Sequence, residues 1–188
     1  MREIEILVEL QTEIEVAREK LSSFEFKGSK ATIDKYFYDP LRTNLQLNAE
    51  NKLMECCRLR TKNNQHFVTY KIDIYDGHIW KYSDEHETQV TDIKALQNIF
   101  SNIGLKELVT IDNIKHTYVT EQYEIVIEEV KDLGNFLEVE YHIDNETKSV
   151  DEIKEEILDF IRALNLEVGN ELNSGKPELL LLKNGHKK

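Results

Sequence analysis

The sequence predicts an α+β protein built mainly on an antiparallel β-sheet, and three observations lead to that fold class. Apolar residues alternate with polar or charged ones, the period of a half-buried strand, in about eight segments. About three segments carry the wider apolar spacing of an amphipathic helix. Strands also follow one another directly through the middle of the chain. Eight such strands can close on themselves, so we expect an eight-stranded, closed antiparallel β-barrel flanked by helices.

The strand predictions rest on alternation and on β-prone residues. The predicted segments are 2–10, 31–38, 53–62, 66–74, 80–91, 114–119, 122–130 and 136–142. Between two of them, Lys62-Asn63-Asn64-Gln65 has the composition of a tight hairpin turn. The loop at 39–52 and the tail from about residue 172 are expected to be the most mobile parts of the chain.

Helical spacing predicts three helices. Thr12 and Glu15 have the spacing of a capping box at the start of a helix over 12–22. A second helix is expected over 92–103, and Gly104 is a natural stop for it. A third is expected over 150–164, with Gly169 beyond its end.

Length and composition fit a single domain over 1–188. The 188 residues are enough to bury a core, and 40 % hydrophobic with 32 % charged residues argue against a disordered chain. No apolar run approaches the roughly 18–20 residues of a membrane span, and no signal peptide precedes the first strand. Cys56 and Cys57 are neighbours and would point to opposite faces of a strand, which disfavours a disulfide between them. This cysteine usage fits a reducing cytoplasm.

The formal net charge of −12 restricts the binding partners that the sequence supports. Nucleic acids and anionic membranes attract basic surfaces, so we expect neither as a partner. The acidic balance has two interpretations. It is either a source of solubility alone, or part of it is clustered to hold cations.

Charged residues of one sign recur two positions apart within the predicted strands, so that each pair shares one strand face. Like charges at this spacing repel unless a counter-charge lies opposite. An antiparallel sheet commonly has one wet face, which would explain each pair separately. In a closed barrel, the pairs would instead face one another across a lumen, with the acids directed to a metal ion and the arginines to an anion. The pairs are Glu3 and Glu5, Arg58 and Arg60, Glu85 and Glu87, and Glu138 and Glu140.

Six segments, in order, resemble the CYTH superfamily of class IV adenylate cyclases and thiamine triphosphatases. The segment EIEIL at 3–7 resembles the family signature E-x-E-x-K. The tail GKPELLLL at 175–182 is a weak echo of the S-Y-x-x-L-L ending in the cyclase branch. The further matches are DKYFYDP at 34–40, CRLRTK at 57–62, VTYKID at 68–73, DEHET at 84–88 and IEEVKDLGNFLEVE at 127–140.

The resemblance implies a triphosphate tunnel, an antiparallel barrel that binds a metal-triphosphate complex inside. It implies Mg²⁺ or Mn²⁺ as the cofactor, ATP or another triphosphate compound as the ligand, and a homodimer as one option. By position, the metal ligands would be Glu3, Glu5, Glu138 and Glu140. The triphosphate-binding and catalytic cations would be Arg58, Arg60, Lys71 and Lys115. Further tunnel-lining residues would be Glu85, Glu87 and Glu128.

The chain departs from the family pattern at three basic positions. Leu7 occupies the lysine position of E-x-E-x-K, Ser83 stands where an arginine is common, and Asn113 replaces a lysine. Lys81 or Lys35 is a candidate to compensate for the lysine missing at position 7.

Three functions remain open at this point. The first expectation is a class IV adenylate cyclase activity, in which ATP gives cyclic AMP and pyrophosphate. The second is a triphosphatase that acts on inorganic tripolyphosphate, thiamine triphosphate or a nucleoside triphosphate. The third is a triphosphate or nucleotide binder without catalysis, as the departures at Leu7, Ser83 and Asn113 would suggest.

Overall fold

The computed structural model describes residues 2–142 and 147–185. In these ranges, four helices accompany the strands: α1 (Ile14–Lys20), α2 (Ile93–Asn102), α3 (Val150–Ala163) and α4 (Lys176–Lys183). A short 3₁₀ turn covers Thr43–Leu45. The strands are β1 (Arg2–Glu3), β2 (Glu5–Leu10), β3 (Glu25–Tyr38), β4 (Glu55–Lys62), β5 (Gln65–Asp76), β6 (Ile79–Val90), β7 (Lys106–Val119), β8 (Tyr123–Val130), β9 (Gly134–Tyr141) and β10 (Val168–Glu171).

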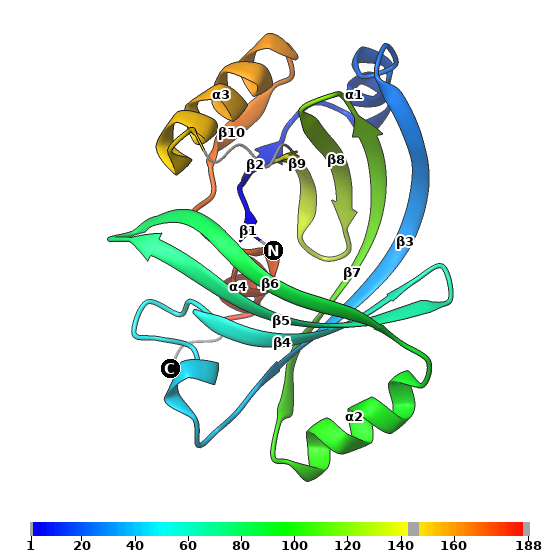
Figure 1. Ribbon diagram of the computed structural model, residues 1–188. Helices are drawn as coiled ribbons and strands as arrows, with labels where there is room; N and C mark the ends of the chain where they lie inside the picture. Colours follow the sequence, from blue (N-terminus) through cyan, green and yellow to red (C-terminus); the bar gives the residue numbers. More distant parts are fainter. Residues whose placement is uncertain (1, 143–146, 186–188) are drawn as a thin grey trace.

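All ten strands of the described residues belong to one antiparallel sheet with the order β1-β6-β5-β4-β3-β7-β8-β9-β2-β10. The sheet is curled into a half-barrel: β4, β5 and β6 run beneath β8, β9 and β2, and β3 and β7 join the two parts (Figure 1). The α+β class and the antiparallel pairing are therefore confirmed. The structure has this curled ten-stranded sheet in place of the expected closed barrel of eight strands.

The N-terminal segment lies against both parts of the sheet. In β1, Glu3 pairs with Ser83 of β6, whereas in β2 Glu5 pairs with Glu140 of β9. The predicted strand over 2–10 is thus divided at Ile4 into two strands with different partners. This division brings side chains of β6 and β9 to neighbouring acids of the same short segment.

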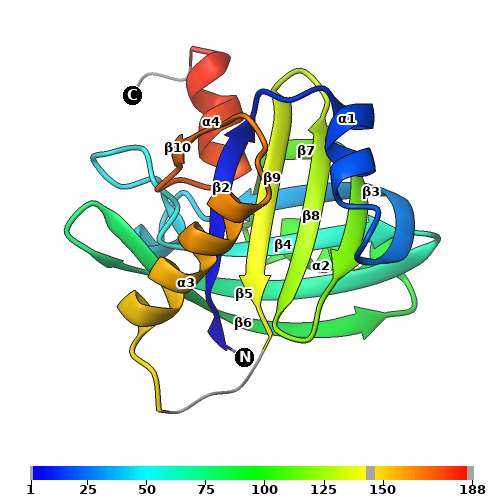
Figure 2. The same cartoon turned by 90° about the horizontal axis from the view of Figure 1, so that it is seen from above.

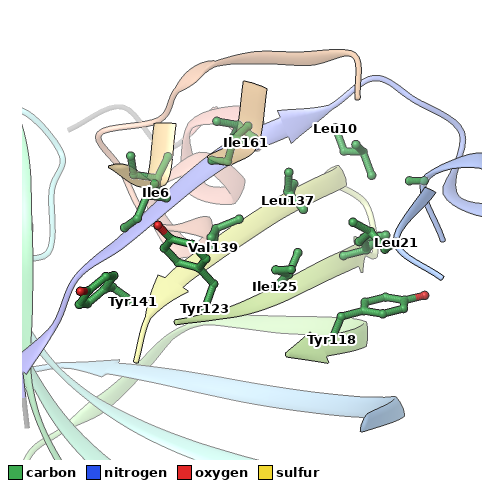
Figure 3. Close-up of a cluster of buried hydrophobic side chains, with 14 of the residues drawn as sticks. Ile6, Leu10, Leu21, Tyr118, Tyr123, Ile125, Leu137, Val139, Tyr141 and Ile161 are labelled. Carbon is green, nitrogen blue, oxygen red and sulfur yellow. The ribbon is translucent and has the colours of Figure 1, made fainter. Parts of the chain in front are cut away.

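The main core lies on the outer face of the sheet, under α1 and α3 (Figures 2 and 3). Alternation along β2 turns Ile6, Val8 and Leu10 into this core. Glu5 and Leu7 consequently point to the inner, concave side of the sheet, where they line a cavity. The charged face of this first strand is therefore the inside of the curl, and its apolar face is the outside.

Local signals account for some element boundaries and fail at others. The predicted hairpin turn is confirmed, because Asn63 and Asn64 have φ of 50° and 59°, as a tight hairpin turn requires. The capping box at Thr12 is wrong: its hydroxyl accepts the backbone N–H of Glu167 at 2.7 Å and leaves α1 without a side-chain cap. Ser149 instead forms a capping box, at the start of α3.

The C-terminal tail differs most from expectation. Residues expected to be mobile form α4, which packs its Leu180 beside Leu7. The four residues just before this tail form β10, which pairs with β2. Pro177 in the first turn suits the start of this helix, since that position needs no backbone N–H. In the part of the chain that the structure describes, no helix is long and apolar enough to cross a membrane.

Candidate functional site: a charged cavity inside the curled sheet

The concave side of the sheet encloses a cavity of about 770 Å³ that collects side chains from the nine strands β1 to β9 and from α4. Every predicted site residue except Glu128 lines it. Glu128 is fully buried directly behind the wall, where it holds two of the lining lysines. Strand alternation explains the gathering, because residues two apart on one strand share a face and here that face is concave.

Arg58 is anchored by the second acidic pair. Its Nη2 donates to Glu85 Oε2 at 3.1 Å, to Glu87 Oε2 at 3.2 Å and to Thr69 Oγ1 at 3.0 Å. Burial lowers the pKa of Arg58, but Tyr36 and the surrounding carboxylates outweigh burial and raise it. The guanidinium is thus a fixed positive charge, oriented by two strands beside its own.

Arg60 forms the most regular ion pair of the cavity. Its Nε and Nη2 donate to the two carboxylate oxygens of Asp34, each at 2.7 Å. Burial alone would raise the pKa of Asp34, but the adjacent Arg60 outweighs burial and lowers it to about 2. The DKYFYDP segment therefore contributes an acid that holds Arg60 in place.

Lys71 lies among three acids. Its Nζ is 3.0 Å from Glu85 Oε1, 3.8 Å from Asp73 Oδ1 and 3.9 Å from Glu5 Oε1. Although burial lowers the pKa of Lys71, these carboxylates raise it well above its usual value. Ser83 donates from its hydroxyl to Asp73 Oδ1 at 2.6 Å.

Lys176 of α4 is the cation that the sequence did not reveal. Its Nζ donates to Glu128 Oε1 at 2.6 Å and to Glu138 Oε2. Lys115 approaches the same carboxylates, at 3.1 Å from Glu128 and 3.8 Å from Glu138. Asn113 donates to the other oxygen of Glu128 at 2.7 Å. The sequence signal that could have found Lys176 was the GKPELLLL tail. Its leucines resemble the family ending, whereas its lysine is the residue that binds the cavity carboxylates.

Neither lysine proposed to replace the one missing at position 7 lines the cavity. Lys35 pairs with Glu107 and Lys81 with Asp151, both at more exposed sites. Leu7 is only 2 % exposed and packs in a cluster with Leu180 of α4. The helix lying against Leu7 therefore supplies nearby positive charge. Lys176 outweighs burial and lowers the pKa of Glu138, and together with Lys71 it partly opposes the burial that raises the pKa of Glu5.

Three acids of the cavity are costly to ionise, because burial and neighbouring acids raise their pKa values more than nearby cations lower them. Burial and then the charge of Glu85 raise the pKa of Glu3 to about 7. Burial and Glu138 raise that of Glu5 to about 8, and burial with Glu3 raises that of Glu140 to about 9. Mutual repulsion of this kind is relieved by a bound cation.

The donor chemistry of these acids fits a hard divalent ion. All the candidate ligands are carboxylate oxygens, which Mg²⁺ and Mn²⁺ prefer. The described residues nevertheless contain no ready-made group of three or more metal-ligating side chains. Mg²⁺ commonly binds through one or two carboxylates together with substrate phosphates, so the acids are compatible with a metal that arrives with its ligand.

The fold and the site define an α+β protein with an ionic cavity inside a curled antiparallel sheet. A model of the CYTH domain family matches residues 1–174. The chain therefore belongs to the CYTH domain family. A Methanocaldococcus jannaschii protein named "Putative adenylate cyclase MJ0240" is 31 % identical over 180 residues, which are 95 % of this chain and 98 % of that protein.

Solved structures share the fold. A protein of Pyrococcus horikoshii OT3 superposes with a TM-score of 0.79 at 26 % identity, covering 96 % of this chain and 99 % of that one. A Hippeastrum protein, described as a "putative adenylyl cyclase" with a dominant triphosphatase activity, superposes with a TM-score of 0.64. It is 15 % identical and covers 97 % of this chain and 96 % of its own, and at that identity the likeness concerns the fold alone.

Proposed function

We propose that the chain is a metal-dependent enzyme that binds the triphosphate of ATP in the cavity and converts ATP to cyclic AMP and pyrophosphate. One observation supports this most directly: arginines and lysines from β4, β5, β7 and α4 converge on the same buried space as the acids of β1, β2 and β9. Such a space suits a polyanion held jointly by cationic side chains and a divalent ion. The adenylate cyclase name of the Methanocaldococcus jannaschii relative favours the cyclase reaction.

Each group has a role that its position supports. Glu3, Glu5, Glu138 and Glu140 would hold Mg²⁺ or Mn²⁺, which when bound neutralises phosphate oxygens. Arg58 and Arg60 would bind the non-bridging oxygens through their forked N–H groups. Lys71, Lys115 and Lys176 would stabilise the negative charge that develops as pyrophosphate leaves.

The carboxylates that pair with these cations position them. Glu85 and Glu87 fix the plane of Arg58, and fully buried Glu128 fixes both Lys115 and Lys176. In the cyclase reaction the ribose 3′-hydroxyl attacks the α-phosphorus. The reaction then depends mainly on alignment and on charge neutralisation by groups that are already in place.

A triphosphatase is the second candidate, and the cavity lining favours it in one respect. The lining contains few aromatic side chains, Tyr36, Trp80 and His86, on which an adenine ring could stack. Inorganic tripolyphosphate would need no such surface. The substitutions at Leu7, Ser83 and Asn113 motivate the third candidate, a binder without catalysis.

One assay distinguishes the three. The protein is incubated with ATP or tripolyphosphate and either Mg²⁺ or Mn²⁺, and the products are identified. Cyclic AMP with pyrophosphate supports the cyclase, whereas orthophosphate without cyclic AMP supports the triphosphatase. Absence of both products, together with ATP-dependent thermal stabilisation, would support the binder. Absence of any ligand effect would contradict the proposal as a whole.

A further inference from the structure

Six lysines and arginines line the cavity, and five of them already have carboxylate partners. Arg58, Arg60, Lys71, Lys115 and Lys176 each have a carboxylate oxygen within 4.0 Å. Within residues 2–142 and 147–185, no hydrogen bond or ion pair engages the ammonium of the sixth, Lys62. A phosphate that binds one of these five must compete with the carboxylate that already pairs with it. A phosphate that binds Lys62 has no such competitor among the described residues.

Lys62 lies at one particular end of the cavity. It is the last residue of β4, directly before the turn at Asn63 and Asn64, and it pairs with Thr32 of β3. Other lining residues at this end are also close to strand termini, such as Thr117 near the end of β7 and Glu124 near the start of β8. These side chains remain partly exposed, and Thr88 near the end of β6 is exposed.

The opposite end of the cavity is closed. Leu7, Leu53 and Ile111, each no more than 2 % exposed, line it there beside the start of α4. Glu178 of that helix is buried and accepts the backbone N–H of Leu53 at 3.0 Å, which fixes α4 across this end. A polyanion therefore has access from the end where Lys62 lies.

The surroundings of Lys62 are cationic. Lys30, Arg60 and Lys115 are its charged neighbours, with Glu124 as the single opposing acid among them. Burial and these cations lower the pKa of Lys62. An excess of cations over acids around the entrance of a cavity attracts and retains an incoming anion.

We propose that Lys62 captures the incoming polyphosphate and holds the phosphate that lies nearest the open end of the cavity. This inference rests on the proposed function. It assigns Lys62 a part in affinity and in substrate entry, because its ammonium exchanges only water for phosphate, without the loss of an internal ion pair.

The test measures the Kd for tripolyphosphate in the presence of Mg²⁺ by titration calorimetry, for the whole chain and three variants. Lys62→Gln should weaken binding about tenfold or more, the scale of one lost charge-assisted hydrogen bond. Lys62→Arg should restore most of that affinity. Lys35→Gln removes the same charge from outside the cavity and should leave Kd within about twofold.

Thermal denaturation of each variant shows whether it is folded, and the Lys62→Arg rescue separates a loss of charge from a loss of structure. With an active enzyme, Lys62→Gln should raise KM more than it lowers kcat. A wild-type protein that does not bind tripolyphosphate overturns the proposed function and this inference with it. A wild-type protein that binds, alongside a Lys62→Gln variant that binds equally well or a Lys35→Gln variant that loses as much, overturns the inference about Lys62 alone.

Discussion

At the scale of single residues, the cavity differs from an ordinary charged surface because most of its cations are already oriented by acids. Arg58 is held by Glu85 and Glu87, and Arg60 by Asp34, before any ligand is present. Preorganised charges need no further ordering when a ligand binds, so each contributes more to affinity than a mobile surface charge.

Arg58→Ala should therefore weaken tripolyphosphate binding by about 10- to 100-fold, the equivalent of roughly 1.5–3 kcal/mol for one charge-assisted contact. Calorimetric titration gives the Kd, and thermal denaturation reports whether the fold persists. Arg162→Ala is the matched control, because Arg162 is exposed and pairs with nearby Asp159 on the surface. Equal affinity of the wild type and Arg58→Ala would remove Arg58 from the site.

At the scale of elements, α4 connects the stability of the fold to the charge of the cavity. Lys176 at its start balances Glu128, which is fully buried, while its leucines pack under Leu7. A helix with these two attachments holds the closed end of the cavity in place.

Lys176→Ala should lower the free energy of unfolding by about 3 kcal/mol, since it leaves two buried carboxylates with less counter-charge. Lys183→Ala changes an exposed lysine of the same helix and should cost less than about 0.5 kcal/mol. Chemical denaturation measures both values. A similar small loss in the two variants would mean that the ion pairs of Lys176 contribute little.

Glu178 gives α4 a pH dependence with a definite sign. Burial raises its pKa from 4.5 to about 7. A raised pKa means that the stabilising contribution is complete below pH 4.5 and is lost as the pH rises through about 7. Glu178→Gln retains an acceptor for the Leu53 N–H and cannot ionise.

The stability of Glu178→Gln relative to wild type should accordingly increase between pH 4.5 and pH 7, by about 1–3 kcal/mol, and then level off. Denaturation curves across this range measure the difference. Glu155→Gln, at an exposed position of α3, should show no such trend. A difference in stability that stays constant at all pH values would show that Glu178 does not titrate between pH 4.5 and pH 7 as predicted.

At the scale of the whole molecule, the effect of the net charge of −12 depends on where the acids lie in the fold. The part of that charge that is costly to ionise lies in the cavity, where burial and repulsion by neighbouring acids raise the pKa values of Glu3, Glu5 and Glu140. The same acids would become favourable once a divalent ion is bound.

Glu140→Gln should therefore stabilise the metal-free protein by about 1 kcal/mol and at the same time reduce the rise in Tm that Mn²⁺ with tripolyphosphate causes in the wild type. For the wild type that rise corresponds to about 2.7 kcal/mol when the free ligand is at 100 times Kd, and EDTA should reverse it. Glu15→Gln on α1 serves as the control. An unchanged response to Mn²⁺ would exclude Glu140 as a ligand.

Sequence alone anticipated the parts of the molecule that depend on strand alternation. Glu3, Arg58 and Glu138 could be assigned to one face each because a period of two leaves only two choices. The beginning of β3 could not be anticipated, since Glu25–Lys30 carries little alternation and is extended through pairing with β7. The strand that stabilises this extended segment is distant in sequence, so the residues of the segment itself do not predict it.

The same reasoning explains why the C-terminal part of the site was missed. The segment 176–183 is short and is placed by its packing under β2 and β7, so its helix depends on tertiary contacts. Lys176 then reaches Glu128 across 48 positions of sequence. The roles proposed for the cavity residues in catalysis and metal binding remain predictions until they are measured.

The division of the N-terminal strand at Ile4 has a practical consequence for handling the protein. Residues 2–5 connect β6 and β9, because they pair with β6 on one side of Ile4 and with β9 on the other. They also carry two of the cavity acids. Purification tags, fluorophores or surface tethers fused next to these residues would disturb both the strand pairing and the acids. Attachments are better placed after Lys183, the last residue of α4.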